Sequence, residues 1–90
     1  MKQNPNYIMC EISGMNILVP VGTATANFNG VISLGGIGGD IWTLLENEIS
    51  RDELVEKILS EYDVSRETVT ADIDSFLEKL RNAGCLEEQT

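Results

Sequence analysis

The strongest constraint on the fold of this chain is a change of residue pattern at residues 30–42, GVISLGGIGGDIW. Before this stretch, β-rich runs alternate with turn signals, and after it apolar residues recur at helical spacing. The stretch itself holds five of the eight glycines. Strands therefore come first and helices second, which predicts an α+β domain without alternating strand–helix units.

Two β-rich runs before the glycines predict a hairpin. Residues 7–12 read YIMCEI and residues 16–20 read NILVP, and both have the apolar, β-branched character of strands. Ser13 and Gly14 lie between them and are a turn signal. We therefore expect an antiparallel hairpin at the start of the sheet.

The next stretch, residues 21–29, is ambiguous. Its alternating threonine and alanine indicate an extended segment, yet alanine and asparagine are weak strand formers. Asn29 and Gly30 form a turn pair, after which residues 31–34, VISL, predict a third short strand. A sheet of two or three strands is therefore expected.

Three helices are predicted after Gly36, because apolar residues then recur at helical spacing. Ser50 and Glu53 form a capping box that opens the second helix. Ser65 caps the third helix and Gly84 ends it. The apolar stripes expected to face the core are Ile37, Ile41, Trp42, Leu44 and Leu45; Leu54, Val55, Ile58, Leu59 and Tyr62; and Val69, Ile73, Phe76 and Leu80, widened by Leu77.

The chain of 90 residues is expected to form one domain, residues 1–90, with strands at about 7–34 and helices at about 36–84. Three helices and a small leading sheet indicate a winged-helix-like α+β fold. The N-terminus has the features of neither a signal peptide nor a membrane anchor, so we expect a cytoplasmic protein.

The net charge of −9 comes from one half of the chain. Residues 1–39 carry only Lys2 and Glu11, whereas residues 40–90 carry fourteen acidic and five basic residues. Such a half repels nucleic-acid phosphates and anionic membranes and attracts a basic partner. Nucleic acid and membranes are therefore not expected as partners.

No catalytic or metal-binding set of residues is recognisable in the sequence. The chain has no histidine, which excludes histidine-based metal sites and every nucleophile–histidine pair. Cys10 and Cys85 are interpreted as buried thiols, with a disulfide between them as the alternative. The paired acids of the helices are expected on solvated faces. We expect no cofactor, no metal and no enzyme activity.

The glycine-rich turn does not match a phosphate-binding motif. A P-loop needs Gly-Lys-Ser/Thr where this chain has Gly38, Gly39 and Asp40, and the aspartate places a carboxylate where an anion binds. Gly36 and Gly38 begin a dinucleotide motif, but Ile41 stands where its last glycine is needed. The glycines are therefore interpreted as structural, giving backbone freedom and close strand–helix approach.

A peptide-binding groove is one hypothesis that these residues support. Leu77 widens the apolar stripe of the third helix beyond what a small core needs, which favours a partly exposed apolar face. Residues 30–34, GVISL, have the character of a short strand at a sheet edge, where unpaired amides and carbonyls accept a guest strand.

Residues 31–86 resemble the PqqD family, whose members are also described as RiPP recognition elements. The family pattern is a strand, a glycine-containing turn, an apolar helix ending Leu-Leu, a capped helix, a Tyr-x-Val joint and a helix ending before glycine. The matching residues are Leu34, Gly38, Ile41, Trp42, Leu44, Leu45, Ser50, Glu53 and Leu54, with EYDV at 61–64 and ADIDSFLEKLRNAGCL at 71–86. Gly35 and Gly36 depart from the pattern, which often has Asn and Glu there.

The resemblance implies a non-catalytic protein that binds the leader of a ribosomally made precursor peptide and presents it to a modifying enzyme, often a radical SAM protein. The founding members serve pyrroloquinoline quinone synthesis, and other members serve other peptide products. The leader is implied to add as a strand to residues 30–34 and to pack against residues 65–83. The residues expected to bind it are Gly30, Val31, Ile32, Ser33 and Leu34 on the strand, and Thr70, Ile73, Asp74, Leu77 and Arg81 on the helix, Ile73 being equally compatible with the core. The acidic half favours a leader or an enzyme surface that carries lysine or arginine.

The alternative is a winged-helix-type regulatory or assembly protein that acts through DNA or a protein partner. Its third helix would offer Arg66, Lys79 and Arg81 to phosphates. Four acids share that helix, however, so it can make few phosphate contacts. A neighbouring gene for a radical SAM enzyme and a short peptide would favour the leader-binding hypothesis.

Overall fold

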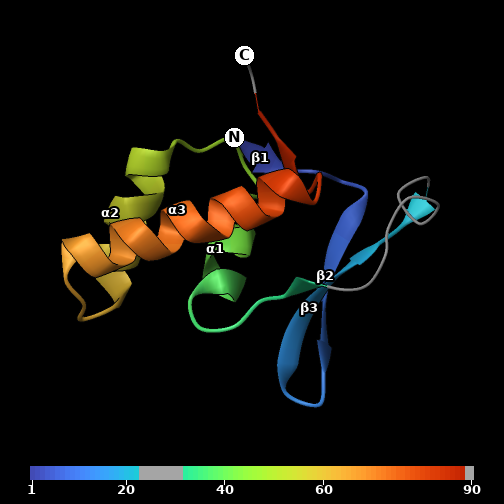
Figure 1. Ribbon diagram of the computed structural model, residues 1–90, viewed down its shortest axis with the longest axis horizontal. Helices are drawn as coiled ribbons and strands as arrows, with labels where there is room; N and C mark the ends of the chain where they lie inside the picture. Colours follow the sequence, from blue (N-terminus) through green and yellow to red (C-terminus); the bar gives the residue numbers. More distant parts are fainter. Residues whose placement is uncertain (23–31, 89–90) are drawn as a thin grey trace.

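The predicted order of strands followed by helices is confirmed (Figure 1). The computed structural model describes residues 1–22 and 32–88. Within them, a three-stranded antiparallel sheet leads into three helices, and two further short strands pair with each other. The elements are β1 (Lys2–Gln3), β2 (Tyr7–Ile12), β3 (Met15–Pro20), β4 (Ile32–Ser33), α1 (Gly38–Leu44), α2 (Arg51–Glu61), α3 (Arg66–Asn82) and β5 (Leu86–Glu87).

The hairpin forms where the turn signal predicts it. Ser13 and Gly14 have φ angles of 54° and 80°, and a two-residue turn with both φ angles positive matches the right-handed twist of the flanking strands. The turn sets the register that pairs Ile12 with Met15. The strand order is β2-β3-β4, so β4 lies at one edge of the sheet. Residues 23–31, which include most of the ambiguous segment together with Gly30 and Val31, lie outside the described residues.

A second ladder, not predicted from the sequence, joins the two ends of the described chain. β1 pairs with β5, with Lys2 opposite Glu87 and Gln3 opposite Leu86. The Asn4 side chain adds a hydrogen bond to the Gly84 carbonyl at 2.9 Å. Strands of two residues show no periodicity, so the sequence pattern contains no signal for them.

The helices begin and end at the predicted caps. The Ser50 hydroxyl accepts a hydrogen bond from the Glu53 amide at 3.1 Å, and the Glu53 carboxylate accepts one from the Ser50 amide at 3.2 Å. Ser65 caps α3 through the Thr68 amide, and Gly84 follows α3 with a φ of 77°. α1 begins at Gly38, two residues later than expected, because Gly36 has a left-handed φ of 57°. Among the described helices, none is long and apolar enough to cross a membrane.

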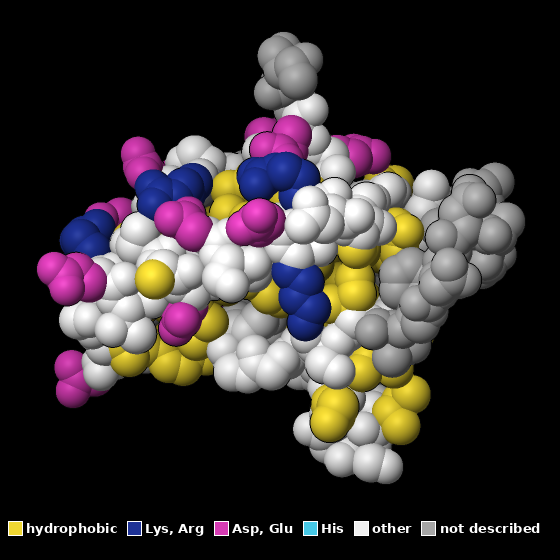
Figure 2. Space-filling model, in the orientation of Figure 1, with side chains coloured by type: hydrophobic (Ala, Val, Ile, Leu, Met, Phe, Trp, Pro, Cys, Tyr) yellow, Lys and Arg dark blue, Asp and Glu magenta, His cyan; other side chains and the backbone are white. Residues whose placement is uncertain are grey.

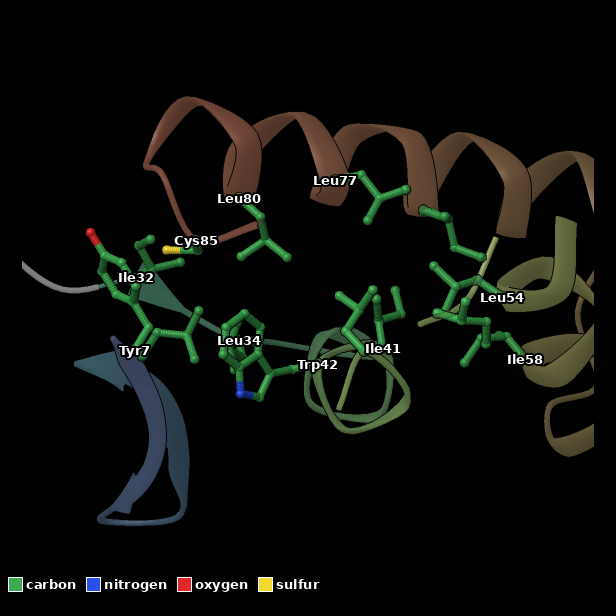
Figure 3. Packing of buried hydrophobic residues seen from close by; sticks show 14 of the residues in the cluster. Tyr7, Ile32, Leu34, Ile41, Trp42, Leu54, Ile58, Leu77, Leu80 and Cys85 are labelled. Carbon is green, nitrogen blue, oxygen red and sulfur yellow. The ribbon is translucent and has the colours of Figure 1, made fainter. Parts of the chain in front are cut away.

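The core lies between α3, α1, α2 and the inner face of the sheet. Figure 3 shows Leu77 and Leu80 pointing from α3 toward Ile41 and Trp42. Leu77 is only 3% exposed, so its prediction as a residue that widens the stripe beyond the core is wrong. Phe76, predicted as core, is only partly buried. Tyr62, also predicted to face the core, is 37% exposed, and its hydroxyl donates to the Asp40 carboxylate.

The two cysteines are free thiols, and the interpretation of buried thiols is confirmed for Cys85 only. Cys85 is fully buried after α3, whereas Cys10 on β2 is half-buried. Burial raises the pKa of the Cys85 thiol to about 11, because a charged thiolate would lose its hydration. Cys85 therefore stays protonated and packs as a small apolar residue.

Candidate functional site

The outer edge of β4 is open within the described residues. β4 pairs with β3 alone, with Ser33 opposite Ile17 and Ile32 opposite Leu18. The Leu34 amide, next along the chain, donates to the Asn16 carbonyl at 2.8 Å. Because hydrogen bonds alternate along an antiparallel pair, the amide and carbonyl of Ser33 point away from β3. Ser33 therefore presents both main-chain groups to the position of a guest strand.

A hollow of about 350 Å³ lies beside this open edge. Its apolar part comes from Phe76 of α3 and from Ile37 and Ile41 at the start of α1. Figure 2 shows hydrophobic side chains over the hairpin and between the sheet and the helices, whereas charged side chains cover α2 and α3. The remaining lining residues are Ser33, Gly35, Gly36, Gly38, Asp72, Ser75 and Lys79.

The glycines of the turn shape this hollow. A Cβ at Gly38 would lie 3.1 Å from the Phe76 ring and 3.5 Å from the Leu34 Cβ, so a larger residue would require the ring to move by a few tenths of an ångström. Gly36 supplies the left-handed φ that turns the chain from β4 into α1. The structural interpretation of the glycine cluster is confirmed at these two positions.

Four residues of α3 face the hollow, and we call Asp72, Ser75, Phe76 and Lys79 the groove flank. The Lys79 ammonium donates a hydrogen bond to the Ser33 carbonyl at 3.3 Å, which joins α3 to the open edge of β4. Neither Asp72 nor Lys79 forms an ion pair with any residue of the described ranges.

Three residues predicted to bind a leader lie on a different side of α3, and we call Thr70, Asp74 and Arg81 the paired flank. Arg51 of α2 binds Asp74 through two hydrogen bonds, one of them 2.8 Å long, and this lowers the pKa of the Asp74 carboxyl. Arg81 binds Glu88 after β5, which lowers the pKa of that carboxyl in the same way. Thr70 lines a hollow between α2 and α3. The structure does not bring these residues to β4.

The other predicted residues divide between the edge and the core. Ser33 is exposed at the open edge, whereas Ile32 and Leu34 point inward and are 7% and 3% exposed. Ile73 is fully buried, so the core alternative holds for it, and Leu77 is buried beside it. Neither side chain lies on the outward strip of α3 predicted from the sequence.

The groove flank is not among the binding residues predicted from the sequence. A signal for it exists, because Asp72, Ser75, Phe76 and Lys79 recur at spacings of three and four and share one side of a helix. Helical periodicity shows that they lie together, but it does not show which neighbour they face. That choice depends on how α3 packs against α1 and the sheet.

The described residues contain no group of three or more cysteine, aspartate or glutamate side chains placed to hold a metal ion. The buried Cys85, with its raised pKa, is a poor nucleophile at neutral pH. The features that this surface does offer are an open strand edge, an adjacent apolar hollow and two charges that form no ion pair among residues 1–22 and 32–88. They are suited to binding an extended peptide.

Comparison with known proteins agrees with this geometry. The family model for coenzyme PQQ synthesis protein D (PqqD) matches residues 16–86. A solved structure of TbiB1 in complex with the TbiA(beta) leader peptide is similar over 100% of this chain and 99% of that chain, with 31% sequence identity and a TM-score of 0.75. The comparison with curated proteins gave no match.

Proposed function

This chain belongs to the PqqD family, and on that premise we propose that it binds the leader of a ribosomally made precursor peptide and presents it to a modifying enzyme. The similar TbiB1 structure contains a bound leader peptide and matches this chain along its whole length. The proposed role is non-catalytic, and a radical SAM enzyme is the partner class that the family resemblance implies.

The observation that carries this proposal is the open edge of β4 beside the hollow. A guest strand would pair with the amide and carbonyl of Ser33, and its alternate side chains would reach the partly buried Phe76 and Ile37. Each main-chain hydrogen bond contributes about 1 kcal/mol net, and the apolar contacts add selectivity.

The proposed site keeps the strand of the sequence prediction and changes the helix surface. β4, which is the described part of the predicted strand, remains the strand to which the leader adds, with Ile32 and Leu34 anchoring it to the core. The groove flank takes the place of Thr70, Asp74 and Arg81 as the surface that contacts leader side chains. Ile73 and Leu77 support that surface from within the core.

The regulatory alternative has little support from α3. Arg66 is paired with Glu56 at 2.8 Å and Arg81 with Glu88, so two of the three basic residues of α3 are already neutralised. Lys79 alone is a weak basis for DNA binding, since several phosphate contacts are needed for affinity.

An NMR titration tests the proposal. The probe is the leader of the short peptide encoded beside the gene of this protein, added to the ¹⁵N-labelled chain. We expect the largest amide shifts at Ser33, along residues 35–38 and along residues 72–79. Shifts confined to the paired flank, or no shifts at all, would contradict binding at β4.

A further inference from the structure

We propose that Lys79 makes the β4 groove selective for a guest strand that carries a carboxylate next to the residue paired with Ser33. The inference rests on the proposed function and specifies its ligand. The surrounding surface is acidic overall and favours basic ligands. Lys79 is assigned the opposite preference, for an acidic side chain.

Lys79 already binds one of the main-chain groups that a guest strand would use. The Ser33 carbonyl points to the open edge, and the Lys79 ammonium binds it at 3.3 Å. A guest strand on this edge donates its own amide to the same oxygen. A carbonyl oxygen has two lone pairs, so it can accept from the guest amide and from Lys79 at once, and the Lys79 ammonium is then held at the open edge beside the guest.

Lys79 also differs from the other basic residues of α3 in the availability of its charge. Arg66 and Arg81 on the same helix are held by Glu56 and Glu88. Lys79 has no ion-pair partner within residues 1–22 and 32–88. An ammonium has three donors, so one can hold the Ser33 carbonyl while the others face the guest strand. A guest carboxylate there accepts a charge-assisted hydrogen bond that a neutral side chain cannot match.

The charges of the groove flank also differ in their position along the groove. Asp72 lies on the same flank as Lys79, seven residues earlier, which is about 10 Å along the helix axis. The hollow therefore has an acidic end and a basic end, with Phe76 between them. A guest carboxylate is favoured at the Lys79 end and repelled at the Asp72 end, so the two charges select the register of the guest strand.

Binding measurements with single carboxylate replacements test the inference. The probes are the same leader peptide and versions of it in which each Asp or Glu is replaced singly by Asn or Gln. Their dissociation constants are measured for the native chain and for Lys79→Met, which removes the charge and keeps a long side chain. Lys57→Met is the matched control, because it makes the same charge change on α2, away from the groove.

We expect one replacement to weaken binding to the native chain by about three- to tenfold, as one partly exposed charged pair allows. The same replacement should leave binding to Lys79→Met unchanged and should weaken binding to Lys57→Met as it does for the native chain. In the free protein, Lys79→Met should also shift the Leu34 amide resonance, because that amide shares a peptide group with the Ser33 carbonyl.

The outcomes separate this inference from the proposed function. The leader could shift the β4 amide resonances while each carboxylate replacement changes its affinity equally for the native chain and for Lys79→Met. That result would overturn only the role of Lys79. A leader that binds at β4 without any carboxylate does the same. A leader that fails to bind the native chain overturns the proposed function, and this inference with it.

Discussion

The two flanks of α3 carry similar polar side chains and differ in what those side chains contact. On the paired flank, Asp74 and Arg81 bind Arg51 and Glu88, so their charges are neutralised within the molecule. On the groove flank, Asp72 and Lys79 lie beside an apolar hollow without an ion pair in the described residues. Charges neutralised in this way have little to gain from a partner, whereas the unpaired charges can contribute to one.

The inward side of α3 gives the largest expected contrast with the groove flank. Leu77→Ala removes a side chain that is 97% buried, and the cavity it leaves should lower the free energy of unfolding by about 2–5 kcal/mol. Phe76→Ala should cost less stability, because Phe76 is only partly buried, and it should weaken leader binding severalfold. Urea denaturation and a leader-binding assay measure the two effects.

Leu77→Met is the matched control for the core position, since it conserves volume and should cost less than about 1.5 kcal/mol. It should leave leader affinity unchanged. A loss of affinity in Leu77→Met with no loss in Phe76→Ala would show that the inward side, and not the groove flank, contacts the leader.

Leu77 lies in the core and Phe76 lines the hollow, which is the reverse of the sequence prediction. This difference shows what the sequence pattern could predict. Hydrophobic periodicity located the apolar stripe of α3, but the centre of a stripe is set by the rotation of the helix against its neighbours. Gly38 determines part of that rotation, because it lets α1 approach the Phe76 ring. This contact joins residues far apart in sequence, so no local pattern contains it.

Local signals predicted the fold more fully than the site. Ser13 and Gly14 specify the hairpin, and Ser50 and Ser65 specify two helix starts, because each acts within a few residues. The family resemblance identified the strand that forms the proposed site. Which surface of α3 faces that strand depends on tertiary packing. For this surface the sequence predicted the paired flank, whereas the structure places the groove flank beside β4.

The second contrast separates the two hydrogen-bonding sides of β4. Ser33→Pro removes an amide that points to the open edge and is not used by β3, so the fold should persist. A guest strand would lose that donor and meet the proline ring, and leader affinity should fall by about tenfold or more. Ser33→Ala keeps the amide and should bind nearly as the native chain does. Equal affinities for the proline and alanine variants would exclude strand addition at Ser33.

The third contrast lies within the glycine turn. Gly38→Ala brings a methyl group to 3.1 Å from the Phe76 ring, which must shift toward the hollow. We expect a loss of about 1 kcal/mol in stability, reduced by the better helix propensity of alanine, and weaker leader binding. Gly35→Ala is the stability control, because nothing lies within 4 Å of its added Cβ. Thermal unfolding of both variants checks this difference, and an equal loss in both would contradict the close-packing role of Gly38.

The smallest effect is expected on the paired flank, where the pH dependence of stability reports the Asp74 ion pair. Hydrogen bonds from Arg51 lower the pKa of Asp74, so the folded state favours the ionised carboxylate. The resulting stability is fully present above the ordinary aspartate pKa of about 4 and is lost as the pH falls through the lower folded-state pKa. Asp74→Asn should therefore melt a few degrees below the native chain at neutral pH, and the two should converge on acidification.

Leader affinity distinguishes the two flanks in the same pair of variants. Asp74→Asn should bind the leader as the native chain does, because its partner is Arg51 and not the guest strand. Lys79→Met should melt close to the native chain, because the residue is exposed and the hydrogen bond that it loses, to the Ser33 carbonyl, lies at the surface; it should lose affinity for the leader. If Asp74→Asn weakens leader binding more than Lys79→Met does, then the paired flank contacts the leader and its ion pairs open when the leader binds.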